Sequence, residues 1–162
     1  MSDKIRKSDV YRKYVFDEMA KMEKLSVENL ERYVDSLDDH KAEKLCSYYS
    51  HSRKNGVYSF VSRGPKKWTV KTVDISNIRI RGINESVNHY LRRNGWWLEN
   101  IGKDKSIPKL KEFKKHGHIH NRSKSLIAHK VRDKYIIIDG NHRAIKMSCG
   151  GKKEFELIYY SN

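Results

Sequence analysis

Apolar positions recur at helical spacing through the first third of the chain. The first such stretch covers residues 4–24, where no Gly or Pro interrupts the pattern. Ser26 then has the side chain typical of a helix N-cap, and a second apolar stripe follows it. A third helix is predicted over residues 39–52. We therefore expect a helical N-terminal unit at residues 1–55.

After this unit the pattern changes to short runs rich in β-branched and aromatic residues, which favour strands. Two stretches return to helical spacing, one at 84–99 and one from Ser106 to Gly117. The runs that predict strands are 57–62, 68–75, 78–80, 125–131, 135–138 and 155–160. The expected fold class is α+β, with a small mixed β-sheet domain over residues 56–162 preceded by the helical unit.

Charge is distributed unevenly along this pattern. The 162 residues include 35 Lys and Arg against 20 Asp and Glu, a formal net charge of +15. Residues 1–40 hold 8 basic and 10 acidic side chains, so the excess lies in residues 41–162, with a net charge of +17. A domain this basic attracts polyanions, with nucleic acid first among them. The alternative is that the charge only maintains solubility, for which a net charge of about 2–8 suffices in a small domain.

Several classes of protein are disfavoured by the sequence. No apolar run approaches the roughly 20 residues of a membrane helix, and the N-terminal segment lacks the apolar core of a signal peptide. Cys46 and Cys149 stand too far apart in sequence for a CxxC metal site or a disulfide framework. We expect a cytoplasmic protein with no membrane partner.

The segment YIIIDGNHRAIKMSCGG carries the clearest chemistry. A buried strand ends at Asp139, Gly140 permits a tight turn, and a helix begins near Asn141. The N–H groups and dipole at a helix N-terminus favour an anion, and Arg143 can bind phosphate oxygens through two hydrogen bonds. The segment therefore predicts a phosphate site. The alternative is a structural turn in which Asp139 is a cap and Arg143 a surface charge.

This segment resembles the signature box of the ParB/sulfiredoxin superfamily, which is a strand, then Gly-x-x-Arg, then a helix. ParB-like free serine kinases carry Asp-Gly-His-His-Arg there, and this chain has Asp-Gly-Asn-His-Arg at residues 139–143. The resemblance covers roughly residues 68–160 and leaves the helical unit unexplained. It implies a ParB/sulfiredoxin-like domain that binds ATP, or another NTP, together with Mg²⁺.

Carried over by position, the resemblance implies that Gly140, Asn141, His142 and Arg143 contact nucleotide phosphates, joined by His120. Asn141 stands where sulfiredoxins have their reactive Cys, and an Asn cannot supply thiolate chemistry. Sulfiredoxin activity is therefore excluded. The Glu of the ParB box is also missing, which argues against a CTP-dependent partition protein.

Catalysis is expected from three side chains. Asp139 could orient His142, hold Mg²⁺ with the nucleotide, or accept a proton from an attacking hydroxyl. Glu85 stands near the position where the related kinases carry a catalytic Glu. The alternative for Glu85 is a favourable acid in the first turn of a helix.

A basic stretch interleaved with Trp predicts a nucleic-acid surface, because cations track phosphates and exposed aromatic rings stack on bases. The candidate residues are Lys111, Lys114, Lys115, Arg122, Lys124 and Trp96. The alternative for Trp96 is core packing, although adjacent Trp residues do not usually both face inward. His116, His118 and His120 have no nearby Cys to complete a tetrahedral set, so no bound metal is expected there.

The function expected from the sequence is a nucleotide-dependent phosphotransferase or NTPase of the ParB/sulfiredoxin-like type that acts on or binds DNA. One alternative is a ParB-like nuclease that uses the same phosphate box on the DNA backbone. Another is a non-catalytic, basic DNA-binding module. The size and basicity of the chain would suit a phage or mobile-element protein.

Overall fold

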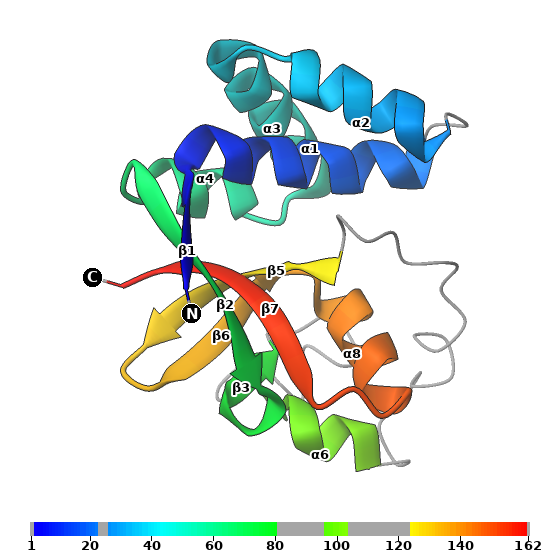
Figure 1. Ribbon diagram of the computed structural model, residues 1–162, viewed down its shortest axis with the longest axis vertical. Helices are drawn as coiled ribbons and strands as arrows, with labels where there is room; N and C mark the ends of the chain where they lie inside the picture. The colour runs from blue at the N-terminus through cyan, green and yellow to red at the C-terminus, as the bar shows by residue number, and fades with distance from the viewer. Residues whose placement is uncertain (1, 23–25, 81–95, 104–123, 162) are drawn as a thin grey trace. The chain divides into compact units, whose positions relative to one another are not determined.

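The computed structural model describes residues 2–22, 26–80, 96–103 and 124–161 (Figure 1). The chain divides into two compact units, a helical unit over Asp3–Trp68 and a sheet unit that begins at Thr69. Helices and a mixed β-sheet are both present, which confirms the α+β class.

The helical unit begins with a short strand and continues as four helices. Their bounds are β1 (Asp3–Arg6), α1 (Lys7–Met22), α2 (Val27–Ser36), α3 (Asp39–Arg53) and α4 (Val57–Ser62). The Ser26 hydroxyl accepts a hydrogen bond from the Asn29 backbone N–H at 3.2 Å, so the predicted N-cap is confirmed. Every side chain of α1 from Val10 to Met19 is buried, charged residues included.

The strand predicted at 57–62 is wrong, because these residues form α4. Val57 and Val61 are the buried positions and stand four residues apart, which is helical spacing. The side-chain oxygen of Asn55 accepts a hydrogen bond from the Val57 backbone N–H at 3.1 Å. The Ser50 hydroxyl accepts one from the Tyr58 backbone N–H at 2.9 Å. These contacts start a helix and outweigh the β preference of the side chains.

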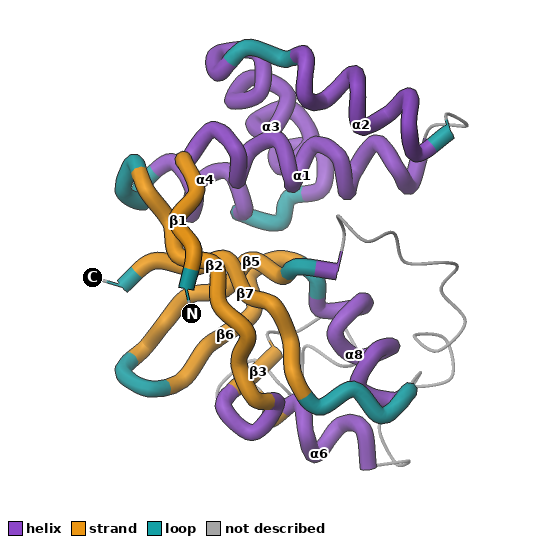
Figure 2. The backbone as a smooth tube through the Cα atoms, in the orientation of Figure 1, coloured by secondary structure: helices purple, strands orange, loops and turns teal. Residues whose placement is uncertain are grey.

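Strands and two helices make up the described part of the sheet unit (Figure 2). Their bounds are β2 (Lys67–Asp74), β3 (Ile78–Ile80), β4 (Trp96–Trp97), α6 (Leu98–Lys103), β5 (Leu126–Val131), β6 (Lys134–Asp139), α8 (Asn141–Cys149) and β7 (Glu154–Tyr160), with a 3₁₀ turn at Ile75–Asn77. Among the described residues of this unit, the strands form a mixed sheet in the order β2-β7-β5-β6-β3-β4. Strands β5 and β6 form an antiparallel hairpin, whereas β7 runs parallel to β5 and β3 runs parallel to β6.

The core of this unit lies on one face of the sheet. Alternate residues of the strands, including Ile78, Ile80, Tyr135 and Ile137, pack against apolar side chains of α6 and α8. The predicted strands at 68–75, 78–80, 125–131, 135–138 and 155–160 are confirmed to within a residue or two.

Two predicted helices of this unit fare differently. The helix predicted at 84–99 is wrong over Trp96–Trp97, which form β4, and correct from Leu98. Its residues up to 95 lie outside the described part of the chain, as does the helix predicted from Ser106 to Gly117.

Candidate functional site

The predicted strand–turn–helix exists as β6, Gly140 and α8. We call residues 139–143 the phosphate box. Gly140 has φ of +106°, a region that side chains with a Cβ rarely adopt. A Cβ built at Gly140 would lie 2.5 Å from Leu126 Cδ2 and 2.9 Å from Arg143 Nη2. Glycine is therefore required here both by the backbone angle and by the close approach of two neighbouring side chains.

The β5–β6 hairpin changes register immediately before the phosphate box. Ala128 pairs with Ile137 and Ile127 pairs with Asp139, so β6 has one extra residue, Ile138, at this point. A β-bulge of this kind bends its strand and re-aims the side chain that follows. The bulge therefore places Asp139 differently from a residue of a regular ladder.

The first turn of α8 receives no side-chain cap from Gly140. The first intrahelical bond runs from the Ala144 N–H to the Gly140 carbonyl oxygen at 2.8 Å. The backbone N–H groups of residues 141–143 precede this bond, at the positive end of the helix dipole. This is the geometry in which helices bind anions.

Asp139 and Arg143 form an ion pair across the phosphate box. Arg143 Nη2 lies 3.3 Å from Asp139 Oδ2, and the two side chains are 13% and 11% exposed. Asp139 is the last residue of β6 and Arg143 lies in the first turn of α8, so the pair joins the strand to the helix. The pair orders the guanidinium beside the α8 N-terminus, and His142 is exposed on the same turn.

The other candidate residues are placed as follows. Glu85, His120, Lys111, Lys114, Lys115 and Arg122 lie outside the described residues. Lys124 is exposed just before β5. Trp96 is half-buried and packs against the core of the sheet unit, which is the alternative that the sequence left open for it.

Trp97, which the sequence analysis did not select, lies on the opposite face of the sheet from Trp96. Its register partner is Arg79, whose guanidinium carbon lies 5.1 Å from the centre of the Trp97 ring. The signal that could have found this contact is the alternation Ile-Arg-Ile at 78–80. It places Arg79 on the side of β3 away from the core.

Among the described residues, no three His, Cys, Asp or Glu side chains are grouped as a metal site would require. No helix in the described ranges is long and apolar enough to cross a membrane.

No family model, curated protein or solved structure matches the chain. The assignment of a function therefore depends on the residues and geometry of the chain itself.

Proposed function

We propose that the protein is a nucleotide-dependent phosphoryl-transfer enzyme or NTPase that acts on or binds DNA, with the phosphate box as its nucleotide site. One observation carries the proposal. At Gly140, the N-cap residue of α8, a Cβ would collide with Leu126 and with Arg143. Glycine is typical of turns where the backbone must approach a phosphate closely.

Different groups of the phosphate box would make different contacts with the nucleotide. The backbone N–H groups of residues 141–143 would donate to phosphate oxygens, and Arg143 would add a charged, two-pronged contact. A phosphate that engages Arg143 would draw it from Asp139, 3.3 Å away, and leave that carboxylate for another partner.

Asp139 is the acid best placed to hold Mg²⁺ beside ATP. Mg²⁺ is commonly bound by one or two carboxylates together with substrate phosphates, so a single acid fits that pattern. The same carboxylate could instead accept the proton of an attacking hydroxyl. ATP with Mg²⁺ would supply the transferable phosphoryl group.

A second candidate, the non-catalytic DNA-binding module, is favoured by the Asp139–Arg143 pair itself. A largely buried ion pair between the end of β6 and the first turn of α8 can serve as a structural clamp. In that case, replacing Asp139 would change stability and not turnover.

The fate of labelled phosphate separates these functions. The full chain is incubated with γ-labelled ATP, Mg²⁺ and end-labelled DNA. Label on DNA or on a small hydroxyl supports a kinase, free phosphate supports an NTPase, and shortened DNA supports a nuclease.

Asp139→Asn should abolish whichever activity is seen and leave the melting temperature within a few degrees, because the shape of the side chain is nearly constant. Asp133→Asn is the matched control, since Asp133 is 81% exposed in the β5–β6 turn. No activity of the wild-type chain under these conditions, or full activity of Asp139→Asn, would refute the enzymatic proposal.

A further inference from the structure

Five side chains form a continuous row across the sheet face opposite the core. Each member is the register partner of the next, on five neighbouring strands. We call this set the cross-strand row. Its members are Tyr160 on β7, His129 on β5, Ile136 on β6, Arg79 on β3 and Trp97 on β4. Register partners share one face of a sheet, and the residues beside them in sequence point into the core.

All five members are half-buried, so part of each side chain reaches the surface. The described helices of the sheet unit, α6 and α8, pack against the other face. Neighbouring strands lie about 4.8 Å apart, so four steps give a row roughly 19 Å long. That length suits several stacked rings in succession, as in sheets that stack two or three bases on aromatic side chains.

Cations lie beside the ring at the Trp97 end of the row. The Arg79 guanidinium carbon and the Lys134 ammonium nitrogen each lie 5.1 Å from the centre of the Trp97 ring. The Lys134 ammonium also donates a hydrogen bond to the Asn77 side-chain oxygen at 3.1 Å. The Arg79 Nε is buried and has no hydrogen-bond partner within the described ranges. The guanidinium lies over an aromatic ring, and no acid within the described ranges forms an ion pair with it.

The opposite end of the row holds two further rings. His129 and Tyr160 have ring centroids 6.5 Å apart. Between the two ends lies Ile136, which supplies an apolar contact. The row therefore has aromatic rings at both ends, with an apolar and a cationic side chain between them.

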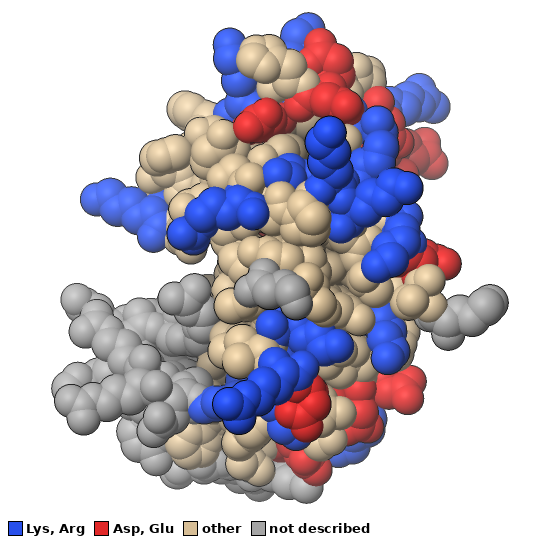
Figure 3. Space-filling model, turned by 90° about the vertical axis from the view of Figure 1, so that its left-hand side faces the viewer, with Lys and Arg blue, Asp and Glu red and all other residues tan. Residues whose placement is uncertain are grey.

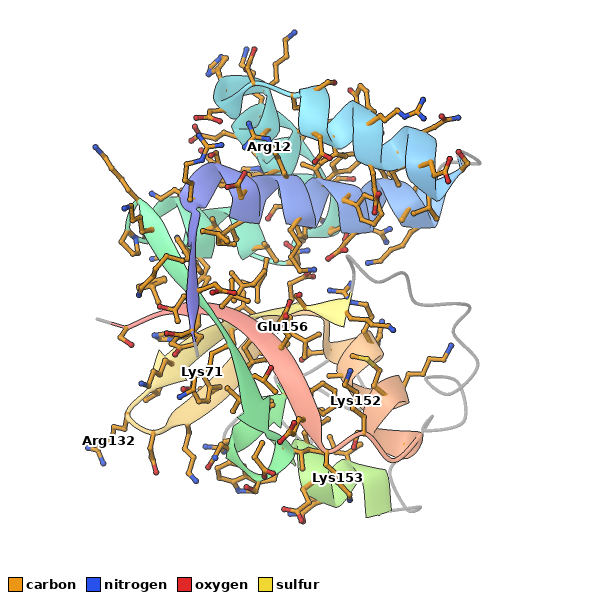
Figure 4. All side chains as sticks on the ribbon, in the orientation of Figure 1. Arg12, Lys71, Arg132, Lys152, Lys153 and Glu156 are labelled. Carbon is orange, nitrogen blue, oxygen red and sulfur yellow. The ribbon has the colours of Figure 1, made fainter. Side chains whose placement is uncertain are left out.

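Basic side chains lie at the Trp97 end of the row and at the turn of the β5–β6 hairpin. Figure 3 shows Lys and Arg side chains on the side of the sheet unit that it views, with Asp and Glu side chains beside them. Figure 4 labels Arg132 at the turn of the β5–β6 hairpin, where its side chain points away from the sheet. The acid nearest Lys134 is Asp133, 3.9 Å away and 81% exposed, and so exposed a pair is too weak to hold Lys134.

We propose that the cross-strand row binds single-stranded DNA. Unpaired bases would stack on the Trp97, His129 and Tyr160 rings, and Arg79 and Lys134 would neutralise the phosphates. In a duplex the bases already stack on one another, so a flat row of rings selects the unpaired strand. The choice of DNA as the polymer rests on the proposed function, whereas the stacking surface does not.

Binding of a fluorescein-labelled oligothymidine to the full chain, measured by anisotropy, tests this proposal. Trp97→Leu should weaken binding about tenfold or more, since a base stacked on an aromatic ring contributes about 1–3 kcal/mol. Trp97→Phe keeps an aromatic ring and should retain most of the affinity. Arg79→Gln and Lys134→Gln should each flatten the log–log salt slope by about 0.7.

Lys153→Ala is the matched control for charge, because Lys153 precedes β7 at the end of that strand away from Tyr160. Lys153→Ala should bind oligothymidine almost as tightly as wild type, so it should not reproduce the loss caused by Trp97→Leu. Far-UV circular dichroism verifies that each variant is folded. Tyr160→Leu provides a second test at the other end of the row, with a loss expected there too.

Three results would overturn the proposal. They are equal affinity of Trp97→Leu and wild type, binding of a duplex as tight as that of the single strand, and clear preference for oligouridine over oligothymidine. Titration of ATP into the same variants separates this site from the phosphate box. Trp97→Leu should keep ATP affinity, whereas Arg143→Ala should lose ATP affinity and keep oligothymidine. Loss of oligothymidine binding in Arg143→Ala with wild-type binding in Trp97→Leu, which is the first of these results, would assign DNA binding to the phosphate box.

Discussion

Charged side chains are buried more deeply in α1 of the helical unit than in the phosphate box and the cross-strand row of the sheet unit. In the helical unit Arg12, Lys13, Asp17 and Glu18 are all buried and all take part in ion pairs. The Lys13 ammonium lies 2.5 Å from Asp17 Oδ2, with both side chains almost fully enclosed. In the sheet unit the charged groups of interest, those of the phosphate box and the cross-strand row, keep part of their surface open.

This difference indicates where ligand chemistry can occur. The Lys13–Asp17 pair is enclosed on both sides, so a ligand in solution does not reach it. Breaking it leaves one charge buried and uncompensated, so it fixes the arrangement of the helices around α1. Partly exposed groups at a helix N-terminus or on a sheet face can exchange an internal partner for an external anion. The groups that can take an external anion therefore lie in the sheet unit, where both proposals place their ligands.

The largest effect is expected from breaking the enclosed pair of the helical unit. Lys13→Met leaves the Asp17 carboxylate buried without its ammonium. It should lower the free energy of unfolding by about 3–5 kcal/mol, measured by urea denaturation. The double variant Lys13→Met/Asp17→Leu replaces the pair with apolar side chains and should recover most of that loss. A single variant as stable as wild type would show that the pair does not fix α1.

A smaller effect is expected in the sheet unit from Gly140→Ala. The new Cβ would lie 2.5 Å from Leu126 Cδ2, and the backbone at φ of +106° is strained for alanine. The free energy of unfolding should therefore fall by about 2–3 kcal/mol. Gly151→Ala is the matched control. It has φ of +93° but nothing within 4 Å of the new Cβ, so it should show only the backbone strain of about 1–2 kcal/mol. Equal losses in the two variants would contradict the close approach at Gly140.

The smallest effect is expected on the stability of the protein at low pH. A hydrogen bond donated by Arg12 lowers the pKa of Asp39 below its ordinary value of 3.8. The resulting stabilisation is present above that ordinary value and is lost as pH falls through the lowered pKa of the folded state. Between pH 7 and pH 3, the melting temperature of wild type should therefore fall further than that of Asp39→Asn. An equal fall in melting temperature in the two proteins would show that the protonation of this carboxylate is not linked to folding.

Local patterns predicted much of the fold. The strands β5, β6 and β7 and the helix α8 follow from apolar runs bounded by turn residues, and their observed ends agree with the sequence to within a residue or two. The tight turn at Gly140 followed from the same local logic. The pattern failed at α4, where hydrogen bonds from Asn55 and Ser50 outweigh the β preference of the side chains.

Long-range pairing could not be read from the sequence in this way. The cross-strand row depends on the register of five strands, and Trp97 and Arg79 became partners only through that register. The bulge before Asp139 likewise depends on how β5 pairs with β6. The Asp139–Arg143 pair was not expected either, because the sequence analysis assigned Arg143 to the phosphate and Asp139 to His142, Mg²⁺ or proton transfer.

Titration calorimetry of ATP with Mg²⁺ tests the central claim, that the phosphate box binds nucleotide, most directly. Wild type should bind, and Arg143→Ala should bind more weakly by about 1.5–3 kcal/mol, the scale of hydrogen bonds to charged groups. Arg132→Gly is the matched control, because it also removes one Arg and its φ of +58° suits glycine. The account predicts that this control binds ATP like wild type. Equal ATP affinity of wild type and a folded Arg143→Ala would contradict it.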